Sequence, residues 1–314
     1  MKNDFLSYVC LAIGQIVIGC VVVLSKTALE LMPVFIYLAA RFLVSATGLT
    51  LSFAAGSRKW TLPTHPEGRL TRKDWALMIL GGLCAGTLFN HFLLWGLKYT
   101  TATSAGIIGS ALPAITVVSA VFFLKEKLSF SQLIAVLFAM LGIMLIGLNN
   151  PNDLDAIGSP YGSLLGDFLI LLSLFPEAWY SIINKFLSKR VTPLASAVVA
   201  NIFTFITFIP FALYESRQFD WSTITPFSAL IVVLAGLCSL LFYWLWPLGL
   251  RRISASTASL FGGLMPVSSC LLAIWFLGEK FHMYEGMGMI LIFVSIWVGS
   301  VAPTRKEGSE ILEH

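Results

Sequence analysis

The sequence predicts an all-α, polytopic membrane protein with ten transmembrane helices, arranged as two inverted five-helix repeats. Its 314 residues are 57% hydrophobic and only 11% charged, about half the charged fraction that is usual in soluble domains. Ten apolar runs can be marked along the chain, and each approaches the length of about 20 residues that crosses a hydrocarbon core of roughly 30 Å as a helix. The third observation behind this fold class is an internal duplication.

The duplication relates residues 96–127 to residues 249–280 at a constant offset of 153 positions. Eleven of the thirty-two aligned positions are identical, among them Pro113 with Pro266, and both copies end in Glu-Lys. A self-similar stretch of this kind indicates that one structural unit occurs twice in the chain. Because each unit holds an odd number of helices, the second unit must enter the membrane upside down relative to the first.

The helices follow in chain order from the apolar runs and their flanking residues. Thr71 with Asp74 and Ser129 with Gln132 have the spacing of capping boxes, which start helices. Three further runs begin at a proline, a residue that is tolerated in a first helical turn: Pro33, Pro193 and Pro226. The predicted spans cover residues 5–25, 33–54, 74–96, 101–123, 129–148, 164–186, 193–213, 226–248, 254–277 and 284–302.

Lys and Arg are distributed unevenly over the predicted connections. With the N terminus inside, the inner segments hold fifteen of these residues and the outer segments hold four. Such a bias marks the cytoplasmic side, so we expect both termini in the cytoplasm. The chain then divides into a first repeat (1–148), an outer linker (149–163), a second, inverted repeat (164–302) and a cytoplasmic tail (303–314).

Several of these features together resemble a known family. The ten spans, the duplicated block of small residues with its proline and final Glu-Lys, and the pair Arg41-Phe42 in the second span are similar to the drug/metabolite transporter superfamily, EamA-type branch. The resemblance covers nearly the whole chain. It implies a carrier for amino acids or other small metabolites in the bacterial inner (plasma) membrane, with a central cavity. It also makes Arg41 a regular feature of the fold, so we assign this residue a structural role.

A polar stripe in the sixth span is the main candidate for a substrate site. Ser173, Glu177, Tyr180, Ser181 and Asn184 lie at i, i+4, i+7, i+8 and i+11, which is one face of a helix. Glu177 lies roughly 13 Å from the inner end of the span, where an unpaired carboxylate costs on the order of 3 kcal/mol or more. We expect this carboxylate to bind a substrate ammonium or to carry a coupling proton. A structural contact with a neighbouring span is the alternative.

Other polar and aromatic residues are secondary candidates for substrate binding. Asn90 and His91 lie in the third span, and the repeat aligns Asn90 with Tyr243 of the eighth. Such side chains can orient a substrate by hydrogen bonds, although satisfied packing explains them equally well. The remaining candidates are a mid-span glutamine, which needs a partner, and two tryptophans that offer aromatic faces: Gln15, Trp179 and Trp246.

The repeated block also predicts a pair of gates. Gly109 and Pro113, like Gly262 and Pro266, would let helices approach closely and bend, although static packing is equally compatible with these residues. We interpret the Glu-Lys pair that ends each copy, Glu126-Lys127 in the first, as an interfacial anchor and as a cap for the next helix.

Composition and motifs argue against several classes of function. The sequence has no Walker motif or HExxH motif, its five cysteines lack metal-site spacing, and loop Lys and Arg explain the net charge of +4 without nucleic acid. We therefore expect neither an enzyme, nor a cofactor, nor a metal site. The partners that we expect are a small-molecule substrate and the lipid bilayer, with protons as a candidate coupling ion, for a monomer or homodimer.

The function predicted from sequence is thus secondary transport of an amino acid, or another compound with an amino group, by alternating access. The alternative substrates are S-adenosylmethionine, another nucleoside-like metabolite, or a cationic drug. The alternatives of another class are a channel, which would favour a continuous polar pore, and an intramembrane enzyme, which would need a nucleophile and base or a metal-ligand set.

Overall fold

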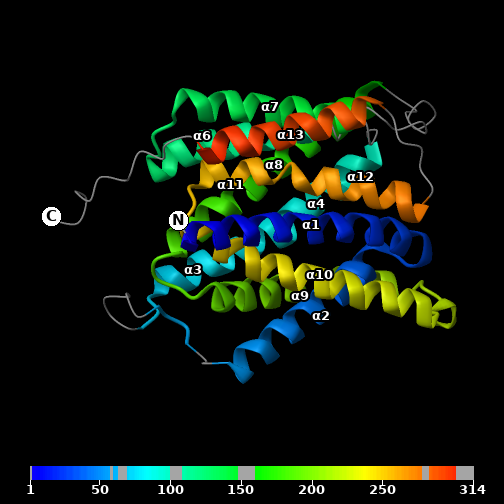
Figure 1. Cartoon of the computed structure of the whole chain (residues 1–314). Helices are drawn as coiled ribbons and strands as arrows, with labels where there is room; N and C mark the ends of the chain where they lie inside the picture. The colour runs from blue at the N-terminus through cyan, green and yellow to red at the C-terminus, as the bar shows by residue number, and fades with distance from the viewer. Residues whose placement is uncertain are drawn as a thin grey trace.

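The structure is a computed structural model, and it describes residues 2–56, 59–62, 69–99, 108–147, 160–277 and 283–301. These ranges are helical, apart from short connections and one isolated antiparallel bridge between Thr61 and Val191. The helices run side by side along a bundle (Figure 1). Eight helical segments within the described ranges are long and apolar enough to cross a membrane.

The helices fall into two groups along the chain. The first group is α1 (Lys2–Leu31), α2 (Val34–Ala55), α3 (Arg72–Gly81), the π-helix η1 (Gly82–Leu88), α4 (Phe89–Tyr99), α6 (Leu112–Leu124) and α7 (Phe130–Gly147). The second group is α8 (Pro160–Leu187), α9 (Pro193–Ser216), a 3-10 turn η2 (Trp221–Thr223), α10 (Pro226–Leu250), α11 (Ala255–Phe261), α12 (Leu264–Leu277) and α13 (Met283–Val301). Eight predicted spans coincide with the long apolar segments, and the fourth and fifth fall on the shorter apolar helices α6 and α7.

The predicted helix starts are present in the structure. Thr71 Oγ1 accepts from the Asp74 amide, and the Asp74 carboxylate accepts from the Thr71 amide at 2.8 Å. Ser129 and Gln132 make the same reciprocal pair before α7. Both capping boxes are therefore confirmed. The prolines also begin their helices, two at the first helical position and one as the N-cap: Pro193, Pro226 and Pro33.

In the part of the chain that the structure describes, the prolines of the repeated block lie at helix starts. The second copy breaks after Phe261, and α12 then starts with Pro266 in its first turn. Pro113 occupies the equivalent place in the first turn of α6. A first-turn proline is stable there because the amide that it lacks would have had no partner. The break itself falls at the turn of Gly262 and Gly263.

Helix packing is organised around two pairs at opposite edges of the bundle. Helix α7 packs against α13 at one edge, and α2 packs against α9 at the other (Figure 1). Between these pairs, α1 lies along α10 and α12, and α8 lies along α4 and α6. The α7–α13 contact is close: a Cβ atom added to Gly142 would lie 2.7 Å from the carbonyl oxygen of Gly288. The largest buried apolar cluster joins α1, α2, α8, α9 and α10.

One end of the bundle is held by two charged side chains, which we call the end clamp: Glu126 and Lys185. The Glu126 carboxylate accepts from the amides of Ala255 and Ser256, at 2.8 and 3.1 Å, at the start of α11. Lys185 Nζ donates to the carbonyl of Leu250, the last residue of α10, at 3.2 Å, and to that of Ile253, in the connection that follows, at 2.8 Å. Glu126 and Lys185 therefore both bind the segment that connects α10 to α11.

The contacts of Glu126 correct one prediction from the sequence. Glu126 caps α11, a helix in the other half of the chain, and not α7, the next helix along the chain. The capping box described above already satisfies the start of α7. A free carboxylate at the end of α6 is thus available for the exposed amides of α11, where the helix dipole favours a negative charge.

Candidate functional site

Glu177 lies in the middle of α8, and its carboxylate has no hydrogen-bond or ion-pair partner among the residues of the described ranges. The side chain is partly exposed. Tyr180 follows Glu177 by about one turn on the same face of α8. A carboxylate inside a membrane-spanning bundle is costly without water, a proton or a cationic partner. The position of Glu177 therefore suits a ligand-binding or proton-binding role.

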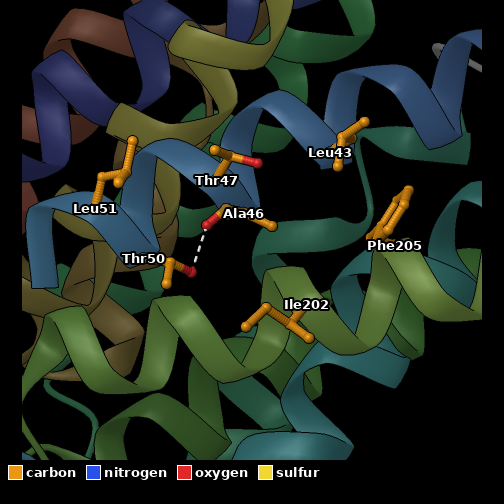
Figure 2. Close-up of a pocket in the computed structure, with 7 residues that line it drawn as sticks. All are labelled: Leu43, Ala46, Thr47, Thr50, Leu51, Ile202 and Phe205. Carbon is orange, nitrogen blue, oxygen red and sulfur yellow. Dashed lines mark hydrogen bonds between the residues drawn. The ribbon is translucent and has the colours of Figure 1, made fainter. Parts of the chain in front are cut away.

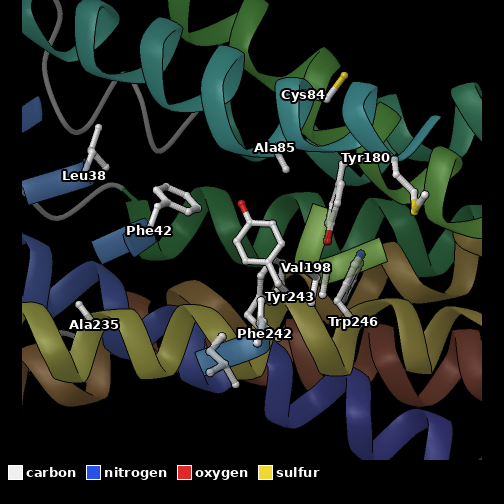
Figure 3. Close-up of a cluster of buried hydrophobic side chains, with 14 of the residues drawn as sticks. Leu38, Phe42, Cys84, Ala85, Tyr180, Val198, Ala235, Phe242, Tyr243 and Trp246 are labelled. Carbon is white, nitrogen blue, oxygen red and sulfur yellow. The ribbon is translucent and has the colours of Figure 1, made fainter. Parts of the chain in front are cut away.

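Several aromatic rings pack together next to the helical turn that holds Glu177. Tyr180 meets Tyr243 edge-on with ring centroids 5.7 Å apart, and Tyr243 meets Phe42 at 6.0 Å. Trp246 stacks on Phe242 at 5.9 Å. Figure 3 shows these side chains converging from α2, α8 and α10, with Cys84 and Ala85 of η1 on the facing side. Four elements that are distant in sequence therefore contribute to one buried region.

Three buried polar atoms in this region have no hydrogen-bond partner in the described part of the chain: Arg41 Nε, Tyr180 Oη and Ser239 Oγ. Asn184 Nδ2 donates to the main-chain carbonyl of Tyr180 at 2.9 Å, and not to its hydroxyl. Ser239 precedes Tyr243 by one turn of α10, so the two share a face. Buried polar groups in folded proteins are nearly always hydrogen-bonded. We call Arg41, Glu177, Tyr180, Ser239 and Tyr243 the central cluster.

Arg41 is the member of the central cluster that the sequence analysis set aside. Its side chain is 8% exposed, and its guanidinium carbon lies 4.7 Å from the ring centroid of Phe42. The Phe42 ring in turn meets that of Tyr243 at 6.0 Å. An ionisable residue deep inside an apolar span is itself a signal in the sequence, although the family resemblance assigns this arginine a structural role.

Two predicted site residues use their side chains to satisfy protein groups. Asn90 Nδ2 donates to the carbonyl of Gly86 at 2.6 Å, inside the π-helix. Asn184 Nδ2 donates to the carbonyl of Tyr180, and its Oδ1 accepts from Ser196 Oγ of α9 at 3.2 Å. These bonds support helix geometry and the α8–α9 contact. A role for either amide in substrate binding stays a prediction.

The remaining candidates are spread over the bundle. The centroid of the His91 ring lies 6.4 Å from that of the Phe35 ring. Phe35 is at the start of α2, at the end of the bundle opposite the end clamp. Trp179 is 43% exposed on the outer side of α8. Gln15 is buried on α1, which packs along α10. Trp246, by contrast, is buried beside the central cluster and donates to Ser181 Oγ at 3.3 Å.

The predicted gate residues lie next to the turns that precede α6 and α12. Among the described residues, a Cβ atom added to Gly109 would meet nothing within 4 Å, and one added to Gly262 would meet only the carbonyl of Ser259. Pro113 and Pro266 start the helices that follow. Their role as gates stays a prediction.

A hollow on the surface lies away from the central cluster. It has a volume of about 280 Å³ and lies between α2 and α9, with an almost wholly apolar lining. Figure 2 shows the seven residues that form it: Leu43, Ala46, Thr47, Thr50, Leu51, Ile202 and Phe205. Leu51 is 64% exposed and Leu43 47%. We regard this hollow as a surface groove between two membrane-facing helices, because it holds no charged group.

Metal binding finds no support in the described ranges, which contain no group of three or more His, Cys, Asp or Glu side chains placed to hold an ion.

Comparisons with known proteins agree with this architecture. Residues 6–148 and 164–301 each match the model of the EamA-like transporter family. An uncharacterized transporter of Bacillus subtilis, YetK, is 30% identical over 299 residues, covering 95% of this chain and 88% of that protein. The WAT1-related protein At4g01450 of Arabidopsis thaliana is 22% identical over 263 residues, covering 76% and 71%. One crystal structure has the same fold, with a TM-score of 0.73 at 16% identity, covering 95% and 96% of the two chains.

Proposed function

Because the chain belongs to the EamA-like transporter family, we propose that it is a secondary transporter that moves a small metabolite with an amino group by alternating access. Its apolar helices make it a multi-pass membrane protein. The observation that carries the proposed substrate class is Glu177, an unpartnered carboxylate in the middle of a membrane-spanning helix. A substrate ammonium would supply the missing counter-charge. The surrounding aromatic rings would bind the apolar body of the substrate.

Alternating access requires two halves that can exchange roles, and the contact pattern supports such a relationship. If α1, α2, α3–α4, α6 and α7 correspond to α8, α9, α10, α11–α12 and α13, the main helix–helix contacts of the described residues have counterparts. The α1–α10 contact corresponds to α8–α4, α1–α12 to α8–α6, and α2–α10 to the contact of α9 with η1. The pairs α2–α9 and α7–α13 correspond to themselves. This pattern is the one expected for ten spans built as two inverted repeats.

The proposed orientation places the end clamp at the cytoplasmic side of the bacterial inner membrane. The connections on that side carry most of the loop Lys and Arg residues, as the positive-inside rule requires. With that end held closed, the central cluster would open to the other side first. A channel is less consistent with this arrangement, because conduction needs a continuous polar path.

The test of the substrate class is a ligand screen on purified wild type and Glu177→Gln, with Glu30→Gln as a matched control on the exposed surface of α1. Amino acids, nucleosides, S-adenosylmethionine and organic cations are added, and the unfolding midpoint is measured. A ligand at a hundred times its dissociation constant stabilises the native state by about 2.7 kcal/mol. We expect an amine-bearing ligand to stabilise wild type and Glu30→Gln, and to lose most of its effect in Glu177→Gln.

Counterflow in proteoliposomes then separates a carrier from a channel. A carrier exchanges labelled for unlabelled substrate and saturates, and a channel does neither. Equal stabilisation of wild type and Glu177→Gln by every ligand that binds would refute the role of Glu177 in substrate recognition. It would leave a structural or proton-binding role for this carboxylate.

A further inference from the structure

The guanidinium of Arg41 is a buried positive charge that lacks the hydrogen bonds a structural arginine would make. Arginine carries five N–H donors, and a buried one is normally paired with carboxylates or carbonyl groups. Arg41 is 92% buried, since 8% of its side-chain surface is exposed. Its Nε has no partner, and no carboxylate lies within ion-pair distance of it in the described ranges. Packing alone therefore does not explain why a charged residue is buried at this position.

Two aromatic rings contact the guanidinium group of Arg41 without using its N–H groups. Its central carbon lies 4.7 Å from the ring centroid of Phe42 and 5.6 Å from that of Tyr37. Contacts of this kind stabilise a cation through the faces of the rings. They do not use the N–H groups, which point outward in the plane of the guanidinium. These donors stay available for an anion with two acceptor oxygens.

The geometry of the central cluster relates Arg41 to Glu177. The Phe42 ring below the guanidinium meets Tyr243 at 6.0 Å, Tyr243 meets Tyr180 at 5.7 Å, and Glu177 precedes Tyr180 by about one turn of α8. Arg41 and Glu177 form no ion pair with one another. Within the described residues, Tyr180 Oη and Ser239 Oγ are also buried without a hydrogen-bond partner. A buried cation, a carboxylate and two hydroxyl groups thus lie along one chain of ring contacts. Together they would be satisfied by a ligand with both an anionic and a cationic group.

We propose that Arg41 forms an anion-binding subsite, so that the transported molecule is a zwitterion whose carboxylate meets Arg41 while its ammonium meets Glu177. This inference rests on the proposed function and narrows its substrate class. Amino acids and S-adenosylmethionine share the required α-amino acid head group. Simple organic cations and nucleosides without a carboxylate would lack half of the binding interactions.

The test uses three pairs of probes that differ in the carboxylate. They are L-phenylalanine with L-phenylalaninamide, L-methionine with L-methioninamide, and S-adenosylmethionine with its decarboxylated form. Dissociation constants are measured by ligand titration of the purified full chain, for wild type and for Arg41→Gln, Arg41→Lys and Glu177→Gln. Arg217→Gln, at an exposed position after α9, serves as the control.

We expect wild type and Arg217→Gln to bind at least one carboxylate form more tightly than its partner, by roughly ten- to a hundredfold. Arg41→Gln should lose that preference while its affinity for the amide or decarboxylated form stays within about threefold. Arg41→Lys keeps the positive charge, so it should keep part of the preference for the carboxylate form. This variant therefore shows whether the loss of that preference in Arg41→Gln reflects misfolding. Glu177→Gln should weaken both members of the pair, because both carry the ammonium.

Two outcomes overturn the proposal. They differ in whether the proposed function is refuted together with the anion subsite. If the amide or amine forms bind as tightly as the carboxylate forms, and do so through Glu177, the anion subsite is refuted and the proposed function stands. If none of the six compounds binds, or none depends on Glu177, the proposed function and the anion subsite are both refuted.

Discussion

Gly86 and Thr204 illustrate how single residues maintain an irregular helix inside the bundle. The π-helix η1 leaves some of its carbonyl groups without the usual partner, which is costly away from water. Thr204 Oγ1 of α9 donates to the carbonyl of Gly82 at 3.0 Å, and Asn90 donates to that of Gly86. Gly86 lies so close to Thr204 that an added Cβ atom would overlap its side chain. The π-helix η1 and Thr204 of α9 therefore stabilise one another.

The substitution Gly86→Ala should consequently destabilise the protein, by roughly 1 to 3 kcal/mol, because the new methyl group displaces Thr204 from its hydrogen bonds. The midpoint of thermal unfolding measures the effect. Gly109→Ala is the matched control, since a Cβ atom there would meet none of the described residues within 4 Å. A midpoint for Gly86→Ala as high as that of Gly109→Ala would contradict the close contact between η1 and α9.

At the scale of elements, each half of the chain supplies a glutamate that caps a helix of the other half. Glu126, after α6, holds the start of α11. Glu215, near the end of α9, accepts from the amides of Phe35 and Ile36 at the start of α2, at 2.8 and 3.1 Å. Carboxylates at helix N-termini gain from the exposed amides and from the helix dipole. These caps join the halves, so a change in the relative position of the halves would break them.

Glu126→Gln should weaken the end clamp, because a neutral amide forms weaker hydrogen bonds than a carboxylate, by about 1 kcal/mol or more. We expect faster alkylation of a cysteine introduced at Ala258, which is fully buried on α11. Glu30→Gln, combined with the same cysteine, controls for the loss of a charge elsewhere. Alkylation at the same rate in all three backgrounds would mean that the clamp does not keep this end closed.

At the scale of the whole molecule, the connections at the end clamp come from both halves. A backbone bond joins Leu62 to Arg190, another joins Thr192 to Trp60, and Arg190 lies 3.6 Å from Asp74. The ends of α6, α8 and α10 meet the starts of α3, α9 and α11 here. If the positive-inside rule holds, this whole end faces the cytoplasm.

Cysteine labelling tests that orientation. Gln218→Cys, between α9 and α10, and Arg251→Cys, after α10, are both exposed and lie at opposite ends of α10. In a background where the five native cysteines are replaced by alanine, a membrane-impermeant maleimide should label only the cysteine at 218 in intact cells. The cysteine at 251 should react after permeabilisation. The reverse pattern would invert the proposed topology.

Composition and residue spacing were sufficient to predict most of the helices. Apolar length marks a membrane-crossing segment regardless of its neighbours, and the capping pairs at Thr71 and Ser129 are local signals that depend on three residues. The polar face of α8 was predicted from helical periodicity in the same way. Local chemistry could also place Glu177 in the middle of its helix, where an acid needs a partner.

Tertiary structure decided which side chains meet. Asn90 and Asn184 carry the same amide, yet the structure joins one to η1 and the other to α9. Glu126 caps a helix that lies 129 residues further along the chain, a partner that no local spacing indicates. Arg41 Nε has no hydrogen-bond partner among the described residues, and its guanidinium lies against the rings of Tyr37 and Phe42. The sequence by itself determined the helices and their membrane character, because these depend on short-range periodicity and hydropathy. The partners of its charged groups were decided only by the packing of distant helices.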